Sequence, residues 1–401
     1  MYKIKFPRIY DHHSHLSLHL LFACCPDFSD CRNTEEVRLK CRELDRSSVN
    51  VGTGWTGLLD MADKAFDDLP PLAVINSSWH GFACNEKAAA LLGANGVIVE
   101  PKTAREKEMA LPGLLRFFSR RCSPQSLRHD ILKSETAKLL ASWHKKGIYG
   151  AEDLMCVLPE EAVALWPAAF RRSLFFSAEA ANGGEGDRKL PPPKLKLFAD
   201  GALSARTAAV SEGYLQGEKG ILIYGDRELT QIFSVCMKNR RPAAVHAIGD
   251  AAIEQVLSCY ERAACSASAE TPFPLRLEHC QFIDEEQAFK AKKLHITLCM
   301  QPNFSADSLT YADRLGEAAL KRNNPLRMLI DKAGFVPGED LLFGSDGLDC
   351  GSATALQSAL FPPFAGQRLS VEELKAGYRA DPQYGFAELL VDPDKKSVIY
   401  A

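Results

Sequence analysis

The sequence has no marked excess of either charge. Across 401 residues, 48 Lys and Arg face 51 Asp and Glu, which gives a formal net charge of −3 with His neutral. Proteins that bind nucleic acid or anionic membranes electrostatically usually carry a strongly basic face. The balance therefore argues against nucleic-acid and membrane partners. We expect a small-molecule substrate, with a homodimer as an open alternative to the monomer.

Long apolar runs are also missing. No 18-residue stretch is free of polar and charged side chains, so the sequence predicts no membrane span. Residues 1–8 lack the apolar core of a signal peptide. The 13 cysteines are an odd number without paired Cys-x-x-Cys motifs, which favours free buried thiols in a reducing compartment. We expect a cytoplasmic protein.

Disorder is excluded by a composition of 46% hydrophobic and 25% charged residues. Short apolar and β-branched runs predict eight strands, several of them followed by segments of helical period such as 227–239 and 250–263. The predicted strands are 3–11, 147–154, 171–177, 195–200, 242–246, 275–279, 296–301 and 341–346. This alternation predicts an α/β fold, and eight units favour a closed (β/α)8 TIM barrel over an open sheet.

The spacing of the first two strands is unusual. There are 132 residues between His15 and Ile148, whereas a barrel unit averages about 30 residues. We therefore predict one barrel domain over residues 1–401 with a long insertion after strand 1, a lid or small subdomain at about 20–140.

Polar side chains follow several predicted strands at their carboxyl ends, the active face of a barrel. His246, His279, Gln301 and Asp346 each close an apolar run. In the segment 11–15, alternation along an extended backbone puts His13 and His15 on one face, half of a metal site. A strand end that merely exposes several histidines is the ordinary alternative. In a barrel the four histidines and Asp346 would point into one mouth.

Lys196 lies in the fourth predicted strand, where an ordinary lysine at the barrel rim is the simplest interpretation. The ordered set of segments, however, resembles the metal-dependent amidohydrolase superfamily. Within it, the chain resembles the amidohydrolase family 3 branch, which includes the N-substituted formamide deformylases. The resemblance covers nearly the whole chain, through segments 11–15, 78–85, 147–148, 196–207, 246–250, 276–281, 301–302 and 344–346.

The resemblance implies a ligand set and a mechanism. It assigns His13, His15, His246 and His279 as metal ligands, Lys196 as a carboxylated lysine bridging two ions, and Asp346 as ligand and proton shuttle. His246 and Asp346 are the implied catalytic residues. The implied cofactors are one or two divalent ions, zinc being favoured over manganese, iron or nickel, and carbon dioxide as a carbamate on Lys196. The ions would bring the pKa of a bound water toward about 7.

Other residues receive secondary assignments. Asp11 and Glu278 are candidates either to orient metal-binding histidines or to form rim salt bridges. Trp55 and His80, with Trp79 beside it, and Gln301 are candidate substrate-binding residues. The histidines interpreted as non-ligands are His12, His19, His129, His144 and His295.

The expected activity is hydrolysis of a non-peptide C–N bond in an amide, formamide or cyclic amide by metal-activated hydroxide. A metal-dependent isomerase or decarboxylase on the same barrel and a non-catalytic binding or regulatory barrel stay open as alternatives. The glycines of 52–57 match a dinucleotide-binding spacing, but the next apolar run, 72–75, ends without the required acidic residue.

This sequence differs at its ends from the family that it resembles. Relatives usually carry a β-sandwich built from strands on both sides of the barrel, whereas only twelve residues precede His13. We expect that sandwich to be largely missing. Segment 386–394 resembles the strand that normally enters it, and we expect this remnant to pack on the barrel instead.

Overall fold

A computed structural model describes residues 1–55, 64–76, 81–119, 128–158, 163–164, 166–171, 175–177, 194–266, 274–347 and 350–401. The chain divides into two compact units. Unit 1 comprises Met1–Leu16, Leu139–Cys156 and Pro167–Ala401, and unit 2 comprises Ser17–Lys138 and Val157–Trp166. No helix among the described residues is long and apolar enough to cross a membrane.

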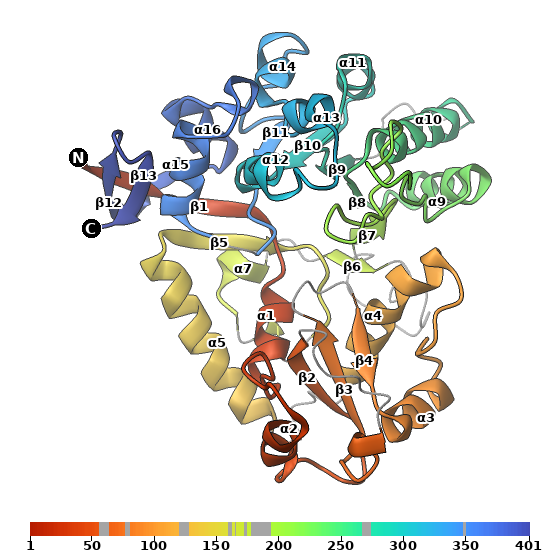
Figure 1. Cartoon of the computed structure of the whole chain (residues 1–401). Helices are drawn as coiled ribbons and strands as arrows, with labels where there is room; N and C mark the ends of the chain where they lie inside the picture. Colours follow the sequence, from red (N-terminus) through yellow and green to blue (C-terminus); the bar gives the residue numbers. More distant parts are fainter. Residues whose placement is uncertain are drawn as a thin grey trace. The chain divides into compact units, whose positions relative to one another are not determined.

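Unit 1 is an α/β structure in which all eight predicted strands are present (Figure 1). Its strands are β1 (Tyr2–Ser14), β5 (Ile148–Asp153), β6 (Phe175–Ser177), β7 (Lys194–Phe198), β8 (Ala243–Ala247), β9 (Leu275–His279), β10 (Thr297–Met300), β11 (Leu341–Phe343), β12 (Asp381–Asp392) and β13 (Ser397–Tyr400). Its helices are α7 (Ala168–Arg171), α9 (Asp226–Lys238), α10 (Asp250–Ser266), α11 (Glu285–Lys293), η2 (Pro302–Ala306), α12 (Asp307–Thr310), α13 (Glu317–Arg322), α14 (Leu326–Asp331), α15 (Ser352–Leu360), η3 (Ala365–Gln367) and α16 (Val371–Gly377).

The predicted parallel pairing is present in two sheets. One sheet runs β11-β10-β9-β8-β7-β6, entirely parallel, and the other runs β13-β12-β1-β5 with β1 parallel to β5. All five residues of β8 are buried, which is typical of a parallel strand covered on both faces. The ladders between described residues do not join the two sheets into one, so closure into a barrel stays a prediction.

β1 changes partner along its length. Tyr2–Pro7 pairs antiparallel with β12, and the register shifts between Pro7 and Arg8, after which residues from Ile9 onward pair with β5. Proline lacks the N–H that a ladder needs, so it marks the place where the first pairing ends. Residues 386–392 of the predicted terminal segment 386–394 lie in β12, which also pairs with β13. Both chain termini lie beside this small sheet (Figure 1).

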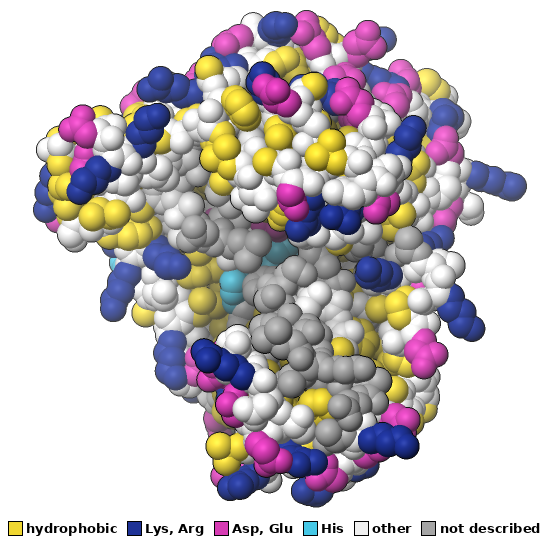
Figure 2. Space-filling view, viewed as in Figure 1, with side chains coloured by type: hydrophobic (Ala, Val, Ile, Leu, Met, Phe, Trp, Pro, Cys, Tyr) yellow, Lys and Arg dark blue, Asp and Glu magenta, His cyan; other side chains and the backbone are white. Residues whose placement is uncertain are grey.

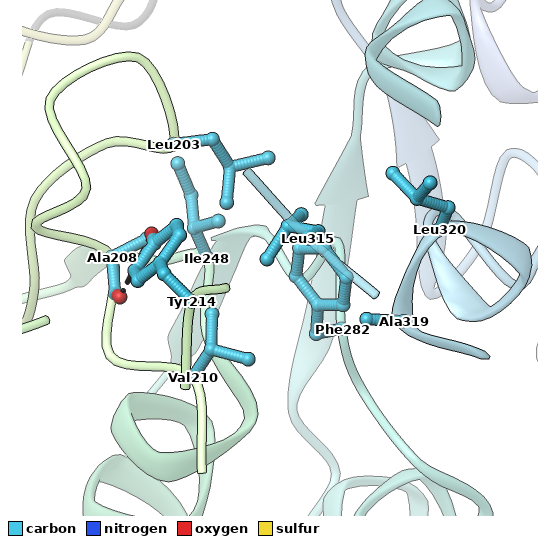
Figure 3. Packing of buried hydrophobic residues seen from close by; sticks show 9 residues of the cluster. All are labelled: Leu203, Ala208, Val210, Tyr214, Ile248, Phe282, Leu315, Ala319 and Leu320. Carbon is cyan, nitrogen blue, oxygen red and sulfur yellow. Dashed lines mark hydrogen bonds between the residues drawn. The ribbon is translucent and has the colours of Figure 1, made fainter. Parts of the chain in front are cut away.

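A hydrophobic cluster unites the loops that follow four parallel strands. Figure 3 shows Tyr214 and Leu203 from the loop after β7 beside Ile248 after β8, and the cluster also includes Phe282 after β9 and Leu315 after β10. The Tyr214 hydroxyl donates a hydrogen bond to the carbonyl of Ala208 at 3.1 Å. Burial of these side chains holds the loops at the carboxyl ends of the strands in a fixed arrangement.

Unit 2 contains a small mixed sheet in the order β2-β3-β4. The elements that lie in or extend into this unit are α1 (Leu16–Ala23), α2 (Thr34–Cys41), β2 (Asn50–Trp55), η1 (Lys64–Phe66), β3 (Leu72–Asn76), β4 (Phe82–Cys84), α3 (Glu86–Ala94), α4 (Ala104–Ser119) and α5 (Arg128–Lys145). Its core includes Phe28, Val37, Phe66 and Val74. A Cβ at Gly52 would lie 2.3 Å from the Phe28 ring, so this glycine serves packing within a strand.

Acidic and basic side chains share the surface, and several cysteines lie in the core. On the face in Figure 2, acidic and basic side chains are interspersed and no patch of one sign stands out. The buried free thiols include Cys31, Cys41, Cys236, Cys259, Cys280 and Cys299.

The approach of β1 to the end of β11 requires a glycine. A Cβ at Gly344 would lie 2.4 Å from both the backbone N and the Cβ of His13.

We predict that Gly344→Ala lowers the free energy of unfolding by at least about 1–3 kcal/mol, because the two backbones must separate. Urea denaturation measures this change. The control is Gly93→Ala in α3, where a Cβ meets nothing within 4 Å and helix propensity favours alanine by up to about 1 kcal/mol. Equal effects of the two substitutions would contradict the close approach.

Candidate metal centre

The backbone of the candidate site is built where β1 meets the segment after β11. The carbonyl of His13 accepts hydrogen bonds from the N–H groups of Ser345 at 3.1 Å and Asp346 at 2.7 Å. The Asp11 carboxylate accepts from the N–H groups of His13 at 3.1 Å and Ser345 at 2.9 Å, and from the Ser345 hydroxyl. These bonds place the side chains of His13 and Asp346 next to each other.

His13, His15 and Asp346 are in direct contact. Oδ1 of Asp346 lies 3.1 Å from Nε2 of His13 and 3.0 Å from Nε2 of His15. Burial alone would raise the pKa of Asp346, but the two imidazoles hold that pKa well below its usual range. The Asp346 side chain keeps 20% of its surface exposed, while His13 is fully buried. Asp346 is therefore an ionised carboxylate with access to solvent.

His279 completes the most compact group. Ligand atoms of His13, His279 and Asp346 all lie within 4.8 Å of one another, a set that could hold a metal ion. The Nδ1 of His279 lies 2.7 Å from Oε1 of Gln301, an acceptor, so Nδ1 carries the proton and Nε2 is left as a ligand atom. Burial and the neighbouring imidazoles of His246 and His13 lower the pKa of His279 well below its usual value, so the ring is neutral.

His246 lies beside this group, with its ring centroid 4.5 Å from that of His279. Its Nε2 is 2.9 Å from the Gly201 carbonyl, which can only accept, so Nε2 carries a proton. The Asp200 carboxylate lies 3.4 Å from the same Nε2. Asp200 also accepts hydrogen bonds from the N–H groups of Ile248 and Gly249, and thereby fixes the loop after β8.

Lys196 is almost fully buried in β7, with 1% of its surface exposed. Its Nζ has no hydrogen-bond partner among the described residues and lies 5.2 Å from the ring centroid of Phe198. Burial lowers the pKa of Lys196, against the attraction of Glu278 and Asp346. A buried amine without a partner is costly to a fold, which makes this residue a candidate for a functional role.

Of the candidate substrate-binding residues Trp55, His80 and Gln301, the structure describes only the side chain of Gln301. Gln301 is fully buried and its amide contacts His279 and His13, so we interpret it as a partner of those imidazoles. Trp55 ends β2, but its side chain is not described, and His80 and Trp79 lie outside the described residues. Phe304 was not singled out from the sequence, yet its ring stacks on His279 at a centroid distance of 5.8 Å.

Two left-handed backbone conformations occur at the site, at His279 with φ 71° and Asp346 with φ 63°. Non-glycine residues adopt this conformation at a cost, and such strain is concentrated at functional sites. The carboxyl ends of β9 and β11 therefore turn sharply where their ligand candidates sit.

Comparison with known proteins identifies the family of this chain. The sequence profile of the amidohydrolase family matches residues 9–358. The chain belongs to amidohydrolase family 3. This family lies within the metal-dependent hydrolase superfamily, so the chain is assigned to the metal-dependent hydrolases.

Similar proteins are found in bacteria and archaea. "Putative amidohydrolase YtcJ" of Bacillus subtilis (strain 168) is 27% identical over 368 residues, covering 82% of this chain and 68% of that protein. An uncharacterized metal-dependent hydrolase from Pyrococcus furiosus superposes with a TM-score of 0.65 at 22% identity, covering 95% of this chain and 83% of the other. An uncharacterized metal-dependent hydrolase from Pyrococcus horikoshii OT3 superposes with a TM-score of 0.67 at 19% identity, covering 95% of this chain and 82% of the other. These structures share the fold.

We predict that Lys196→Met raises the free energy of unfolding of the metal-free amidohydrolase by about 1–3 kcal/mol, because it removes a buried amine without a hydrogen bond to any described residue. Urea denaturation in the presence of a chelator measures the effect. The matched control is Lys292→Met, which removes a donor to the Gly334 carbonyl at 2.6 Å and an ion pair with Asp340. The control should lower stability by at most about 1 kcal/mol. A destabilised Lys196→Met protein would show that the amine has a stabilising role.

Proposed function

We propose that this amidohydrolase cleaves a C–N bond in an amide, formamide or cyclic amide of a small molecule. The observation that carries the proposal is the convergence of His13, His279 and Asp346 within 4.8 Å. His15 and His246 contact members of this group. A cluster of imidazoles beside a carboxylate is suited to a divalent cation rather than to a hydrophobic core.

The donor set fits zinc, with manganese, iron or nickel as further candidates, because nitrogen and carboxylate oxygen ligands suit these ions. The residues that would hold one or two ions are His13, His15, His246, His279, Asp346 and a carboxylated Lys196. When bound, a divalent ion makes hydroxide available from water near neutral pH and polarises a substrate carbonyl.

Lys196 has the properties that carbamate formation requires. Its amine is buried and has no hydrogen-bond partner in the described part of the chain, and its lowered pKa favours the neutral form. A neutral amine adds to carbon dioxide by forming an N–C bond and losing one proton, which yields an anionic carbamate. The carbamate would replace a costly buried amine with a ligand for cations.

Asp346 is placed to hold and move a proton. Its ionised carboxylate contacts His13 and His15 and remains partly exposed, so it is able to accept a proton at Oδ2 and release it toward a leaving nitrogen. His246, whose Nε2 donates to the Gly201 carbonyl and whose ring lies beside that of His279, is the second proposed catalytic residue.

The same proposal includes the architecture that the resemblance implies. We propose that the eight parallel strands close into a barrel, supported by the hydrogen bonds from Ser345 and Asp346 to the His13 carbonyl. The barrel and the segment at about 20–140 would form one catalytic domain with an insertion, although unit 2 is compact by itself.

The carbamate has a direct spectroscopic test. We predict that metal-loaded amidohydrolase prepared with ¹³C-bicarbonate shows a protein-bound carbamate carbon in its NMR spectrum, because Nζ of Lys196 captures labelled carbon dioxide. The signal should be absent in Lys196→Met and unchanged in Lys292→Met. A metal-loaded wild-type protein without this signal would refute the carbamate and leave the imidazole ligands untouched.

The reaction is tested with a panel of N-formyl amines, N-acyl amines and cyclic amides. We predict hydrolysis of at least one class by metal-loaded wild type, and a loss of at least about 100-fold in kcat/KM for Asp346→Asn. Asp340→Asn is the matched control, because Asp340 precedes β11 at its other end and pairs with Lys292. Equal rates for Asp346→Asn and wild type would argue against the proton role. A metal-loaded protein that hydrolyses no class would favour an isomerase, a decarboxylase or a binding protein.

A further inference from the structure

The segment that follows β10 lies against the candidate metal centre. The ring of Phe304 in η2 stacks on the ring of His279 at a centroid distance of 5.8 Å. The side-chain amide of Asn303 donates a hydrogen bond to the carbonyl of Ser345, after β11, at 3.1 Å. Asp307 is the first residue of α12, which follows η2 directly. The start of α12 is therefore held at the edge of the candidate metal centre.

A buried polar network fixes the carboxylate of Asp307. Its Oδ2 accepts a hydrogen bond from Nε2 of Gln281 at 2.9 Å, and the same nitrogen donates to Oδ1 of Asn323 at 3.0 Å. Nδ2 of Asn323 donates to the Phe304 carbonyl at 2.9 Å and to the Ser308 hydroxyl at 3.0 Å. Gln281, Asn323 and Ser308 are all buried. The Asp307 side chain thus has a defined position beside the site.

The negative charge of Asp307 is not neutralised by any residue that the structure describes. Burial and the charge of Asp346 raise the pKa of Asp307 to about 6, against the hydrogen bond from Gln281, and no cation contributes. At neutral pH the carboxylate is ionised. The basic side chains between α12 and α14 have acidic partners of their own: Arg314 with Asp313 at 3.5 Å, Lys321 with Glu317 at 2.6 Å and Arg322 with Glu212 at 3.2 Å.

One oxygen of Asp307 is available to a ligand. Gln281 bonds to Oδ2, and Oδ1 accepts no hydrogen bond within the described ranges, although the side chain is only partly buried. A partly desolvated carboxylate without a counter-ion is costly. An organic cation would supply both the missing charge and a hydrogen-bond donor. The groups of described residues that could hold a metal ion do not include Asp307, which favours an organic cation over a metal at this carboxylate.

We propose that Asp307 is a specificity-determining residue that selects amide substrates bearing a cationic group, an ammonium or a guanidinium. The proposal rests on the proposed function, because it assumes that the amide is cleaved at the candidate metal centre. It narrows the substrate class to N-acyl or N-formyl derivatives of diamines and of amines that carry a guanidinium. The cationic end would pair with Oδ1 of Asp307.

The first measurement is binding to the metal-loaded full chain of probes that differ only in charge. The probes are N-(4-aminobutyl)methanesulfonamide and N-pentylmethanesulfonamide, which resemble amides without being hydrolysed, with shorter and longer homologues of this pair. Calorimetry should show at least one ammonium probe binding about 10- to 100-fold more tightly than its methyl partner. If no ammonium probe binds more tightly than its partner, the proposal is overturned, and this comparison needs no variant to fold.

Asp307→Asn tests the residue itself, because it removes the charge and keeps an oxygen for the Gln281 amide. We expect this variant to lose the preference for the ammonium probe and to bind the methyl probe as wild type does. The matched control is Asp313→Asn in the same loop, where the carboxylate is exposed and pairs with Arg314. The control should keep the wild-type preference. A preference that persists in Asp307→Asn, or an equal weakening of both probes, refutes the specificity role.

The second measurement is hydrolysis of the acetamides and formamides of the same amines. We expect wild type to favour the ammonium substrate by about 10- to 100-fold in kcat/KM, and Asp307→Asn to show no such preference. Wild type that hydrolyses both members of every pair equally refutes the specificity while the proposed function stands. If ammonium probes bind through Asp307 and no amide is hydrolysed, the proposed function fails and the cation site stands.

Discussion

The carboxylate of Asp11 holds together the backbone on which the candidate metal centre depends. It binds the N–H groups of His13 and Ser345, residues that belong to opposite ends of the parallel strand series. Burial raises the pKa of Asp11 to about 6. The hydrogen bonds that Asp11 accepts must therefore offset the cost of removing its carboxylate from water. Gly344 allows the same two backbones to approach, and Asp346 then reaches His13 and His15.

The interior near this join is more polar than packing requires. Glu278, Lys196 and His279 are buried among one another, and a hydrophobic interior would be cheaper to desolvate. Residues that reduce stability in this way are retained where they serve chemistry. The pairs that Arg276 forms with Glu152 and Glu278 compensate part of the charge, whereas Lys196 has no hydrogen bond to a described residue. Arg276, Glu152 and Glu278 therefore form a supporting network, whereas Lys196 is a candidate ligand.

Much of this arrangement is readable from the sequence, because buried parallel strands are short apolar runs ended by polar residues. The runs at 242–246 and 275–279 coincide with β8 and β9 to within one residue, and their terminal histidines lie beside each other. The alternation in segment 11–15 predicts that His13 and His15 share a face, and both imidazoles lie against Asp346. The sequence does not show which strands pair with each other or in which register. Arg276 and Glu278 share a face by parity, but their contacts with Glu152 and His13 depend on the register of β1, β5 and β9. The stacking of Phe304 on His279 depends in the same way on the path of a loop, and the long segment after β1 has no periodicity from which to derive the sheet of unit 2.

The central claim is that the strand-end side chains converge on a metal ion, and anomalous diffraction from crystals of the full chain grown with zinc tests it most directly. The account predicts a zinc peak at about 2.0–2.1 Å from imidazole nitrogens, among them Nε2 of His13 and of His279, with Asp346 beside it. Crystals that show no anomalous peak among these residues, or a peak only at surface side chains, would contradict the account.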